Sequence, residues 1–127
     1  MSARFIFALV PAVAAAACGQ SQPTQPRQPI LVRSEAQDQL HKLDDMNRAI
    51  ALKRAIYDSG SICRRVEKSG YVQEYRNLSM WTARCDNKRD WAIFIGPDGT
   101  AQVRLCKDLA EVGLPACVIS KSGQRSG

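Results

Sequence analysis

The placement of the cysteines limits most strongly what this chain can fold into. The 127 residues contain five cysteines, at positions 18, 63, 85, 106 and 117. The last four fall in a segment so short that one hydrophobic core stabilises it by only a few kcal/mol. Of the three possible pairings we favour Cys63 with Cys85, which join a post-helix segment to a strand end, and Cys106 with Cys117, which bracket a short loop. Chain-entropy reasoning gives each bridge about 3 kcal/mol.

Metal binding and thiol chemistry are the rival uses of these four cysteines. Structural zinc sites usually bring ligands in closely spaced pairs such as C-x-x-C, and no two cysteines here are that close. The same spacing disfavours a redox pair, although Arg64 and Arg65 beside Cys63 would lower the pKa of a free thiol there. We therefore predict two structural disulfides, with no metal and no cofactor.

The first seventeen residues have the three-part layout of a secretory signal peptide. One positive charge, Arg4, precedes an apolar run that is too short to span a membrane and that ends in small residues. Residues 15–19, Ala-Ala-Ala-Cys-Gly, resemble the bacterial lipobox, in which the cysteine receives diacylglycerol and becomes the mature N-terminus. Leucine is usual at the position of Ala15, so cleavage by an ordinary signal peptidase is the alternative.

Lipidation of Cys18 would account for the odd cysteine, because an unpaired thiol is a liability in an oxidising compartment. A lipid group with several acyl chains would then anchor the protein to a membrane surface without a spanning helix. Gly19 after the cysteine implies outer-membrane sorting, by similarity to enterobacterial lipoproteins. A soluble periplasmic or secreted protein is the alternative destination.

Residues 18–33 form the predicted linker. Glutamine and proline dominate this segment, and such a composition cannot bury enough apolar surface to order itself. The prolines favour polyproline II, which at about 3.1 Å per residue would hold a domain up to roughly 50 Å from the anchor. Without lipidation the same composition gives a plain disordered tail. We also expect a disordered C-terminal tail at residues 120–127.

The folded domain is predicted to cover residues 34–119 and to begin with an amphipathic helix. Ser34 and Gln37 match a capping box, Gly60 marks the helix end, and Asp44 with Asp45 allows a break between them. The apolar face expected to be buried consists of Leu40, Leu43, Met46, Ala49, Ile50, Leu52, Ile56 and Tyr57.

After Gly60 the apolar pattern alternates, as is typical of strands. Gly70 is expected to break the first extended segment. The clearest strands are residues 80–85, 91–95 and 101–106, separated by turns at 86–90 and 96–100. A helix packed on an antiparallel meander of three to four strands makes an α+β domain. The sheet face with Ile93 and Val103 should meet the helix, and the face with Ala92 and Phe94 should be partly covered by the C-terminal loop.

We find no catalytic constellation. The single histidine, His41, is interpreted as a solvated helix-face side chain, and Asp44 with Asp45 as a helix cap. Ser-His-Asp or Cys-His triads would lack any local signature here. The glycines at 96 and 99 lie in a hairpin turn and not before a helix, so they form no phosphate loop. We predict no catalytic residue and favour a non-enzymatic role.

Charge gives the remaining indication of a partner. The formal net charge is +6, and the basic residues concentrate in the sheet half of the chain. Basic side chains beside aromatic rings suit an anionic envelope component, a lipid surface or an acidic protein, whereas nucleic acid is an unlikely partner outside the cell. The alternative interpretation is that these basic residues only form a solvated surface and bind no partner. The candidate set is Arg64, Arg84, Arg89, Arg104, Trp81 and Trp91.

The segments Ile62–Val66, Met80–Cys85 and Trp91–Ile95 together resemble small, cysteine-paired exported proteins of Gram-negative bacteria that have no assigned activity. This resemblance implies no catalytic residues. Three hypotheses follow for function. The first is a membrane-tethered periplasmic binding or accessory module of the cell envelope. The second is a small thiol-active or hydrolytic periplasmic enzyme that uses Cys63. The third is an inhibitor of an envelope enzyme that inserts the turn at residues 97–99.

Overall fold

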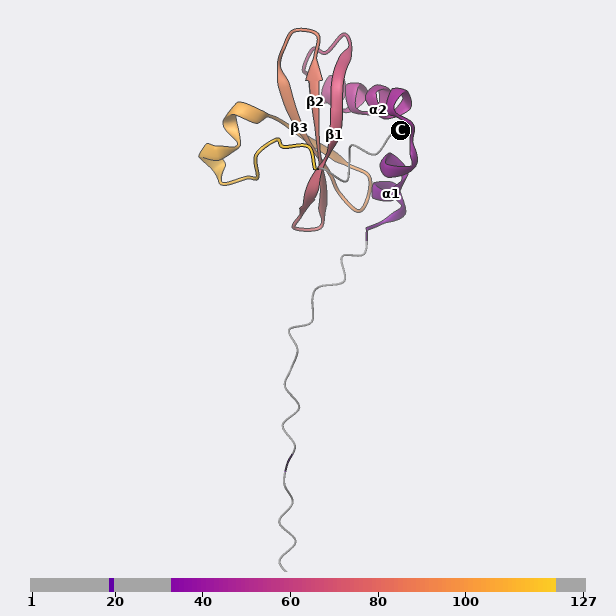
Figure 1. Cartoon of the computed structure of the whole chain (residues 1–127), viewed down its shortest axis with the longest axis vertical. Coiled ribbons are helices and arrows are strands. Elements are labelled where there is room, and N and C mark those ends of the chain that lie inside the picture. Colours follow the sequence, from indigo (N-terminus) through magenta and orange to yellow (C-terminus); the bar gives the residue numbers. More distant parts are fainter. Residues whose placement is uncertain (1–18, 20–32, 121–127) are drawn as a thin grey trace, which may run out of the picture. The chain divides into compact units, whose positions relative to one another are not determined.

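The computed structural model of this chain describes Gly19 and residues 33–120. The predicted signal peptide, Cys18, the linker from residue 20 to residue 32 and the tail from residue 121 lie outside the described residues. The described elements are α1 (Glu35–Lys42), α2 (Asp45–Asp58), β1 (Val66–Tyr75), β2 (Leu78–Cys85), β3 (Asp90–Ile95), β4 (Ala101–Leu105), η1 (Cys106–Asp108) and η2 (Ala110–Val112) (Figure 1). The fold is α+β, as the sequence predicts.

The helical region consists of two helices with a break between them. Ser34 Oγ accepts from the Gln37 backbone N–H at 3.3 Å, and Gln37 Oε1 accepts from the Ser34 N–H at 3.0 Å. Asp44 caps α2 by accepting from the Asn47 N–H at 2.9 Å. Gly60 follows α2 with a φ of 84°, which suits glycine. Among the described residues, no helix combines the length and apolar character needed to cross a bilayer.

The buried face of α2 differs from the expected one. Leu52 and Ile56 are fully buried, whereas Met46, Ile50 and Tyr57 are 70%, 51% and 72% exposed. The prediction was wrong for these three residues because the apolar part of α2 is wider than the part that the sheet covers. Once the two helices are separate, the contacts with the sheet decide which stripe of α2 is buried.

The sheet is an antiparallel meander in the order β1-β2-β3-β4. Trp81 of β2 pairs with Ile93 of β3, which pairs with Val103 of β4. Gly70 does not break β1, because it pairs with Thr82 inside the strand. Glycine at this position allows the close approach of Ile119 in the C-terminal segment.

Each face of the sheet carries its own hydrophobic core. Leu52 and Ile56 of α2 pack on the face that contains Trp81 and Ile93. The opposite face, with Met80, Ala92 and Phe94, packs against Leu109 in the C-terminal segment. Figure 1 shows the helices and the C-terminal segment on opposite sides of the sheet. As expected from the alternation in β3 and β4, one face of the sheet meets the helices and the other is covered by the C-terminal segment.

One disulfide belongs to each core. Cys63 bonds Cys85 in the core beneath α2, and Cys106 bonds Cys117 on the opposite face. This is the pairing that we favoured from the sequence. The first bridge ties the segment before β1 to the end of β2, and the second holds the C-terminal segment near the start of η1. Two disulfides in a chain of this size are typical of an oxidising, exported environment.

Candidate functional site

The two tryptophans of the candidate set belong to the first core. Trp81 is 1% exposed and Trp91 is 6% exposed. Residues two apart on a strand share a face, and the pairing of Trp81 with Ile93 turns this face toward α2. Neither ring reaches the surface, so grouping them with exposed arginines was wrong. The alternation in β2 and β3 carried the signal, because it places both rings on the same face as Ile93.

The four arginines of the candidate set occupy three different environments. Arg84 is held by Asp90 in a two-bond ion pair, with Nε and Nη2 each donating at 2.7 Å. The Arg84 guanidinium lowers the pKa of the Asp90 carboxyl. Arg104 lies on β4, paired with Ala92 and remote from β1. Arg64 and Arg89 lie at the end of the sheet where β1 begins and β2 ends, and Arg84 is at the same end because it pairs with Lys68.

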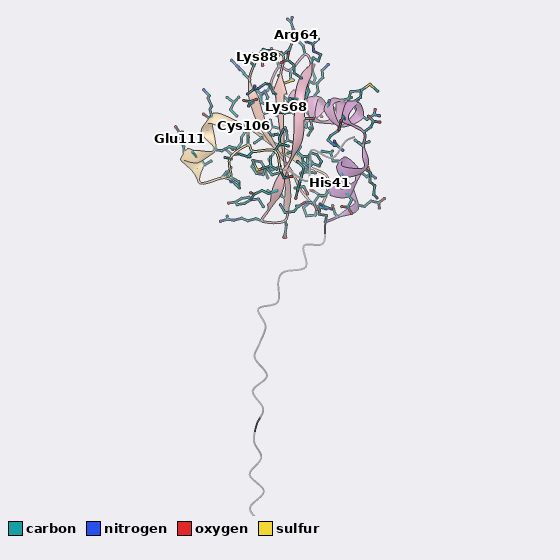
Figure 2. The ribbon with its side chains drawn as sticks, in the orientation of Figure 1. His41, Arg64, Lys68, Lys88, Cys106 and Glu111 are labelled. Carbon is teal, nitrogen blue, oxygen red and sulfur yellow. A yellow bond between two sulfur atoms is a disulfide. The ribbon has the colours of Figure 1, made fainter. Side chains whose placement is uncertain are left out.

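Further cations join Arg64 and Arg89 at that end of the sheet. Glu67 accepts from Lys88 Nζ at 2.7 Å and pairs with Arg65 at 3.6 Å. The hydrogen bond from Lys88, with the nearby charge of Arg65, lowers the pKa of the Glu67 carboxyl. Figure 2 shows Arg64, Lys68 and Lys88 near the same end of the molecule. We define the basic end as Arg64, Arg65, Lys68, Lys88 and Arg89.

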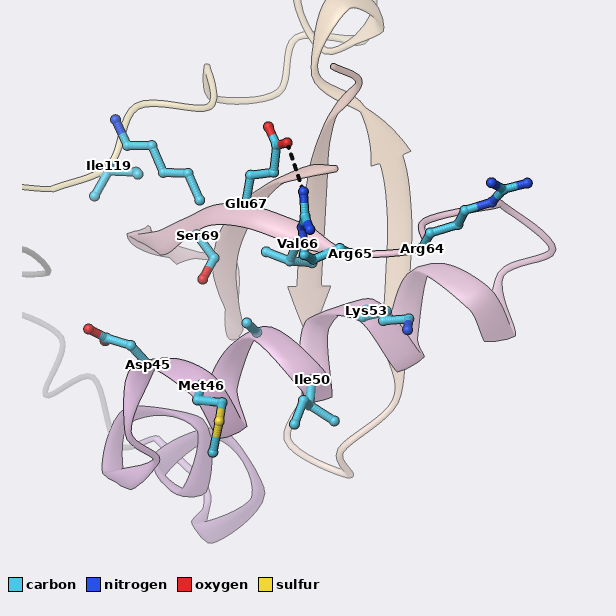
Figure 3. Close-up of a pocket in the computed structure, with 12 residues that line it drawn as sticks. Asp45, Met46, Ile50, Lys53, Arg64, Arg65, Val66, Glu67, Ser69 and Ile119 are labelled. Atoms are coloured by element: carbon cyan, nitrogen blue, oxygen red, sulfur yellow. Dashed lines mark ion pairs between the residues drawn. The ribbon is translucent and has the colours of Figure 1, made fainter. Parts of the chain in front are cut away.

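A groove extends from the basic end between α2 and β1 (Figure 3). It encloses about 610 Å³ and is lined by α2, by residues 64–69 and by Ile119. Met46, Ile50 and Lys53 line its α2 side. These three residues form a second stripe that lies about 100° around the helix from Leu52 and Ile56, so this stripe flanks the contact with the sheet.

The exposed stripe of α2 continues beyond the groove to Tyr57. Met46, Ile50 and Tyr57 are all more than half exposed, and their spacing of four and seven residues places them on one side of the helix. Sequence reasoning merged this stripe with the buried one. The number of apolar residues in α2 separates the two stripes, since it is larger than one contact with a sheet can cover. An exposed apolar stripe beside polar groups is typical of docking surfaces.

The other side of the groove is an edge strand. Within the described part of the chain, β1 pairs with β2 alone, so its other edge has no neighbouring strand. At Tyr71 this edge is used by the C-terminal segment, because the Ser120 N–H donates to the Tyr71 carbonyl at 2.8 Å. The first half of β1, which lines the groove, lies beyond that contact. Sequence analysis predicted the strand but could not show which edge is open.

His41 is half-buried and packs against two aromatic rings, so its interpretation as a solvated side chain was wrong. Its ring centroid lies 4.6 Å from that of Tyr71 and 4.7 Å from that of Trp81. Its Nε2 accepts from Arg33 Nη1 at 3.2 Å. Burial, aided by the charge of Arg33, lowers the pKa of His41. The ring therefore favours its neutral form and serves as a contact between α1 and the sheet.

Glu74 is the centre of the polar contacts beside His41. It accepts from the Tyr71 hydroxyl at 3.0 Å and from Ser79 Oγ at 2.8 and 2.9 Å. Burial, with the Glu74 charge adding to it, raises the pKa of Tyr71 to about 12. Neither the Glu74 nor the Tyr71 side chain lines the groove. These contacts join residues of β1 and β2 to each other.

Residues 19 and 33–120 contain neither a metal site nor a free thiol. No group of three His, Cys, Asp or Glu side chains there is placed to hold a metal ion. Cys63 is 4% exposed and bonded to Cys85, so it offers no free thiol. The groove is therefore the part of the described structure best suited to contact another molecule.

Because comparison with known proteins identifies no relative, the functional proposal rests on the groove. No protein-family model, no curated protein and no solved structure matches this chain.

Proposed function

We propose that this protein is a non-enzymatic binding module of the bacterial cell envelope that recognises an acidic segment of a partner protein. The observation that carries this proposal is the groove between α2 and β1. There, exposed apolar side chains lie beside cations that make no hydrogen bond or ion pair within the described residues. These cations are Lys53, Arg64 and Lys68.

The charges of the groove favour an acidic ligand. Its two lining carboxylates are already engaged, since Asp45 accepts from Arg48 at 2.9 Å and Glu67 accepts from Lys88 at 2.7 Å. Lys53, Arg64 and Lys68 thus leave an excess of positive charge along the groove. A complementary negative segment would be attracted to it and oriented by it.

The apolar part of the groove favours a protein segment over a polyanion. Phosphate groups of lipids or of a cell-wall polymer would neutralise the cations but would leave Met46 and Ile50 exposed. A peptide that carries both acidic and apolar side chains would satisfy both parts of the groove. Burial of apolar area at the centre with charges at the rim is the usual arrangement of a protein interface.

The position of the module in the cell is part of the proposal. The lipobox-like residues 15–19 and the Gln/Pro-rich segment after them support a lipid anchor on Cys18 and a flexible tether. We place the protein on the periplasmic side of the envelope, at the outer membrane. A tethered domain would search for its partner near the membrane surface at a raised effective concentration.

The two other hypotheses gain less support. A thiol-active enzyme needs a free Cys63, which is bonded to Cys85. The turn proposed for an inhibitor is well formed, since Asp98 Oδ1 accepts from the Thr100 N–H at 3.1 Å and from its hydroxyl at 2.7 Å. No feature of that turn points to a target enzyme, so the inhibitor hypothesis stays an untested prediction.

The experiment that tests the proposed function is a titration of the oxidised protein against a fluorescent synthetic peptide that alternates Glu with Val. Fluorescence anisotropy should show binding that weakens with added salt. The double variant Lys53→Glu with Lys68→Glu should reduce the affinity by about tenfold or more, because close charges across an interface couple strongly.

A matched control separates the groove from general charge effects. Arg104→Glu with Lys107→Glu changes the net charge by the same amount at exposed positions outside the groove. This control should bind the peptide nearly as well as the unaltered chain. Equal losses in the two double variants would contradict the assignment of the groove. Binding to anionic lipid vesicles, without any binding of the peptide, would contradict the choice of partner.

A further inference from the structure

We infer that the acidic partner segment binds by strand addition, as an extended fifth strand on the first half of β1. The strand would lie in the slot between α2 and the C-terminal arm, which we define as residues 115–120. This inference rests on the proposed function and adds the mode of binding and the sequence pattern that the groove selects.

The chain itself already uses this edge of β1 for a backbone hydrogen bond. The Ser120 N–H donates to the Tyr71 carbonyl at 2.8 Å, so the backbone of Tyr71 faces away from β2. The register of β1 with β2 is continuous from Lys68 to Tyr71, with an irregularity on either side of this segment. Within it, residues two apart direct their backbone groups to the same edge. Ser69 therefore presents its N–H and carbonyl to the groove, while those of Gly70 face β2. An extended peptide can continue the ladder that Ser120 begins.

The two sides of the slot differ in chemistry. Ser69 pairs with Ala83 of the first core, so its side chain is on the α2 face of the sheet. Lys68 pairs with Arg84 on the opposite face. An added strand directs successive side chains to these two faces in turn. One set would reach Met46 and Ile50 of α2, and the alternate set would reach the Lys68 ammonium.

The groove thus favours a peptide in which apolar and acidic residues alternate. In strand addition the main-chain hydrogen bonds supply much of the affinity, and the alternate side chains supply the specificity. A peptide with the same composition but with its acidic residues grouped together would place some carboxylates against Met46 and Ile50. We therefore expect the grouped arrangement to bind more weakly than the alternating one.

Charge argues against two occupants that the chain itself could supply, a second copy and the C-terminal residues 121–127. A second copy would bring another Arg64 and another Lys68 against the same cations. Residues 121–127 contain Lys121 and Arg125 and no acidic residue. Like charges placed opposite one another disfavour both arrangements, whereas an acidic segment is attracted.

Backbone methylation of the peptide tests the inference without altering the protein. In an added strand, alternate N–H groups point toward β1 and the others point to solvent. We would compare the unmodified Glu/Val peptide with two versions that are N-methylated at one alternate set of residues or at the other. Strand addition predicts that one version loses affinity by about tenfold or more, since it loses several hydrogen bonds, while the other binds nearly as well as the unmodified peptide.

Amide hydrogen exchange provides a second readout on the protein. Without peptide, the Ser69 amide should exchange much faster than the Gly70 amide, whose N–H faces β2. Saturating peptide should slow exchange at Ser69 strongly and change it little at Gly70. Protection of Ser69 in the full chain before any peptide is added would overturn the inference, because the edge would already be occupied by the chain or by a second copy.

The outcomes distinguish failure of the inference from failure of the proposed function. If the unmodified peptide binds and both methylated versions bind equally well, the groove takes an acidic peptide but not as a strand. If the unmodified peptide does not bind, the proposed function fails and the inference fails with it. A selective loss in one methylated version, together with protection of the Ser69 amide, supports both.

Discussion

Gly70 lies directly beneath the side chain of Ile119, so that a β carbon at position 70 would stand 2.6 Å from Ile119 Cγ2. This distance is shorter than non-bonded carbon atoms tolerate. The contact explains why glycine occupies the middle of β1, where it contributes no side chain to the sheet. It also places Ile119 at the end of the groove and fixes the C-terminal arm on the edge strand.

Gly70→Ala should displace the C-terminal arm. The new methyl group would force Ile119 to move and would weaken the bond from Ser120 to Tyr71, at a cost of about 1–3 kcal/mol in the free energy of unfolding. Urea denaturation measures this cost, and limited proteolysis reports release of the arm. Ile119→Ala in the same chain removes the opposing side chain, so the double variant should lose less stability than the sum of the two single changes. Additive losses would contradict the steric explanation.

Gln37 should contribute strongly to stability because its buried side chain joins α1 to the sheet. The residue is 2% exposed, and its Nε2 donates to the carbonyls of Asn77 at 2.7 Å and Ile95 at 2.9 Å. Gln37→Ala leaves both carbonyls without this donor and should lower the free energy of unfolding by about 2 kcal/mol. Gln39→Ala, at an exposed position of the same helix, is the matched control. Similar unfolding midpoints for the two variants would refute this role.

Stability should fall as the pH is lowered through the range in which a free histidine titrates. The folded protein depresses the pKa of His41 below 6.5, chiefly by burial and then through Arg33, and Arg48 acts in the same direction while Glu74 and Asp38 oppose it. The unfolded chain therefore binds a proton at His41 more readily than the folded chain does. The folded state has its full stability above the pKa of His41 in the unfolded chain, and it loses stability as the pH falls toward the lower pKa of His41 in the folded chain.

Variants at position 41 isolate this effect. Chemical denaturation of the unaltered chain between about pH 7 and pH 5 should show declining stability, while His41→Gln should show a flatter profile over the same range. Acidic residues with lowered pKa values, including Asp44, Glu67 and Asp90, act at lower pH because their unfolded values lie near 4. Parallel profiles for the two proteins would exclude His41 as the source.

The two disulfides should differ in their rate of reduction. Cys63 and Cys85 are 4% and 0% exposed, whereas Cys106 and Cys117 are only partly buried. Because a reductant must reach the sulfur atoms, mild thiol treatment of the folded protein should open the Cys106–Cys117 bridge first. Timed alkylation followed by peptide mapping identifies the bridge that opens. Earlier modification of Cys63 or Cys85 would be the opposite result.

The lipid anchor is tested by mass. Expression of the full chain in a Gram-negative host should yield a product that begins at Cys18 and carries the mass of a diacylglyceryl group and its acyl chains. Cys18→Ser should give a product without lipid and should move the protein from the membrane fraction to the soluble fraction. An unlipidated product from the unaltered chain would show that the signal is cut by an ordinary peptidase.

Local sequence signals predicted the features that depend on residues close together in the chain. The capping box at Ser34 and Gln37 needs only three residues of spacing, and Asp44 caps α2 through Asn47 in the same way. Alternation correctly divided the side chains of β3 between the two cores and placed Val103 and Leu105 of β4 on the face toward α2. These interactions form within one element, so the sequence is sufficient to predict them.

The errors lie where distant segments meet. Met46 and Ile50 look like core residues until the sheet covers the neighbouring stripe of α2 instead. Gly70 looks like a strand break until Ile119, which is far away in sequence, is seen against it. His41 looks solvated until Tyr71 and Trp81 are seen to pack against its ring. Each case depends on which surface a second element covers.

The sequence by itself determined the α+β class, the helix caps and the two faces of the central strands, and it favoured, among three possibilities, the cysteine pairing that the structure shows. Tertiary structure alone decided the rotation of α2, the open edge of β1 and hence the groove between them. The physical reason is that caps, turns and alternation are short-range interactions, whereas burial of one helix stripe rather than another depends on the summed packing of residues that the chain brings together only on folding.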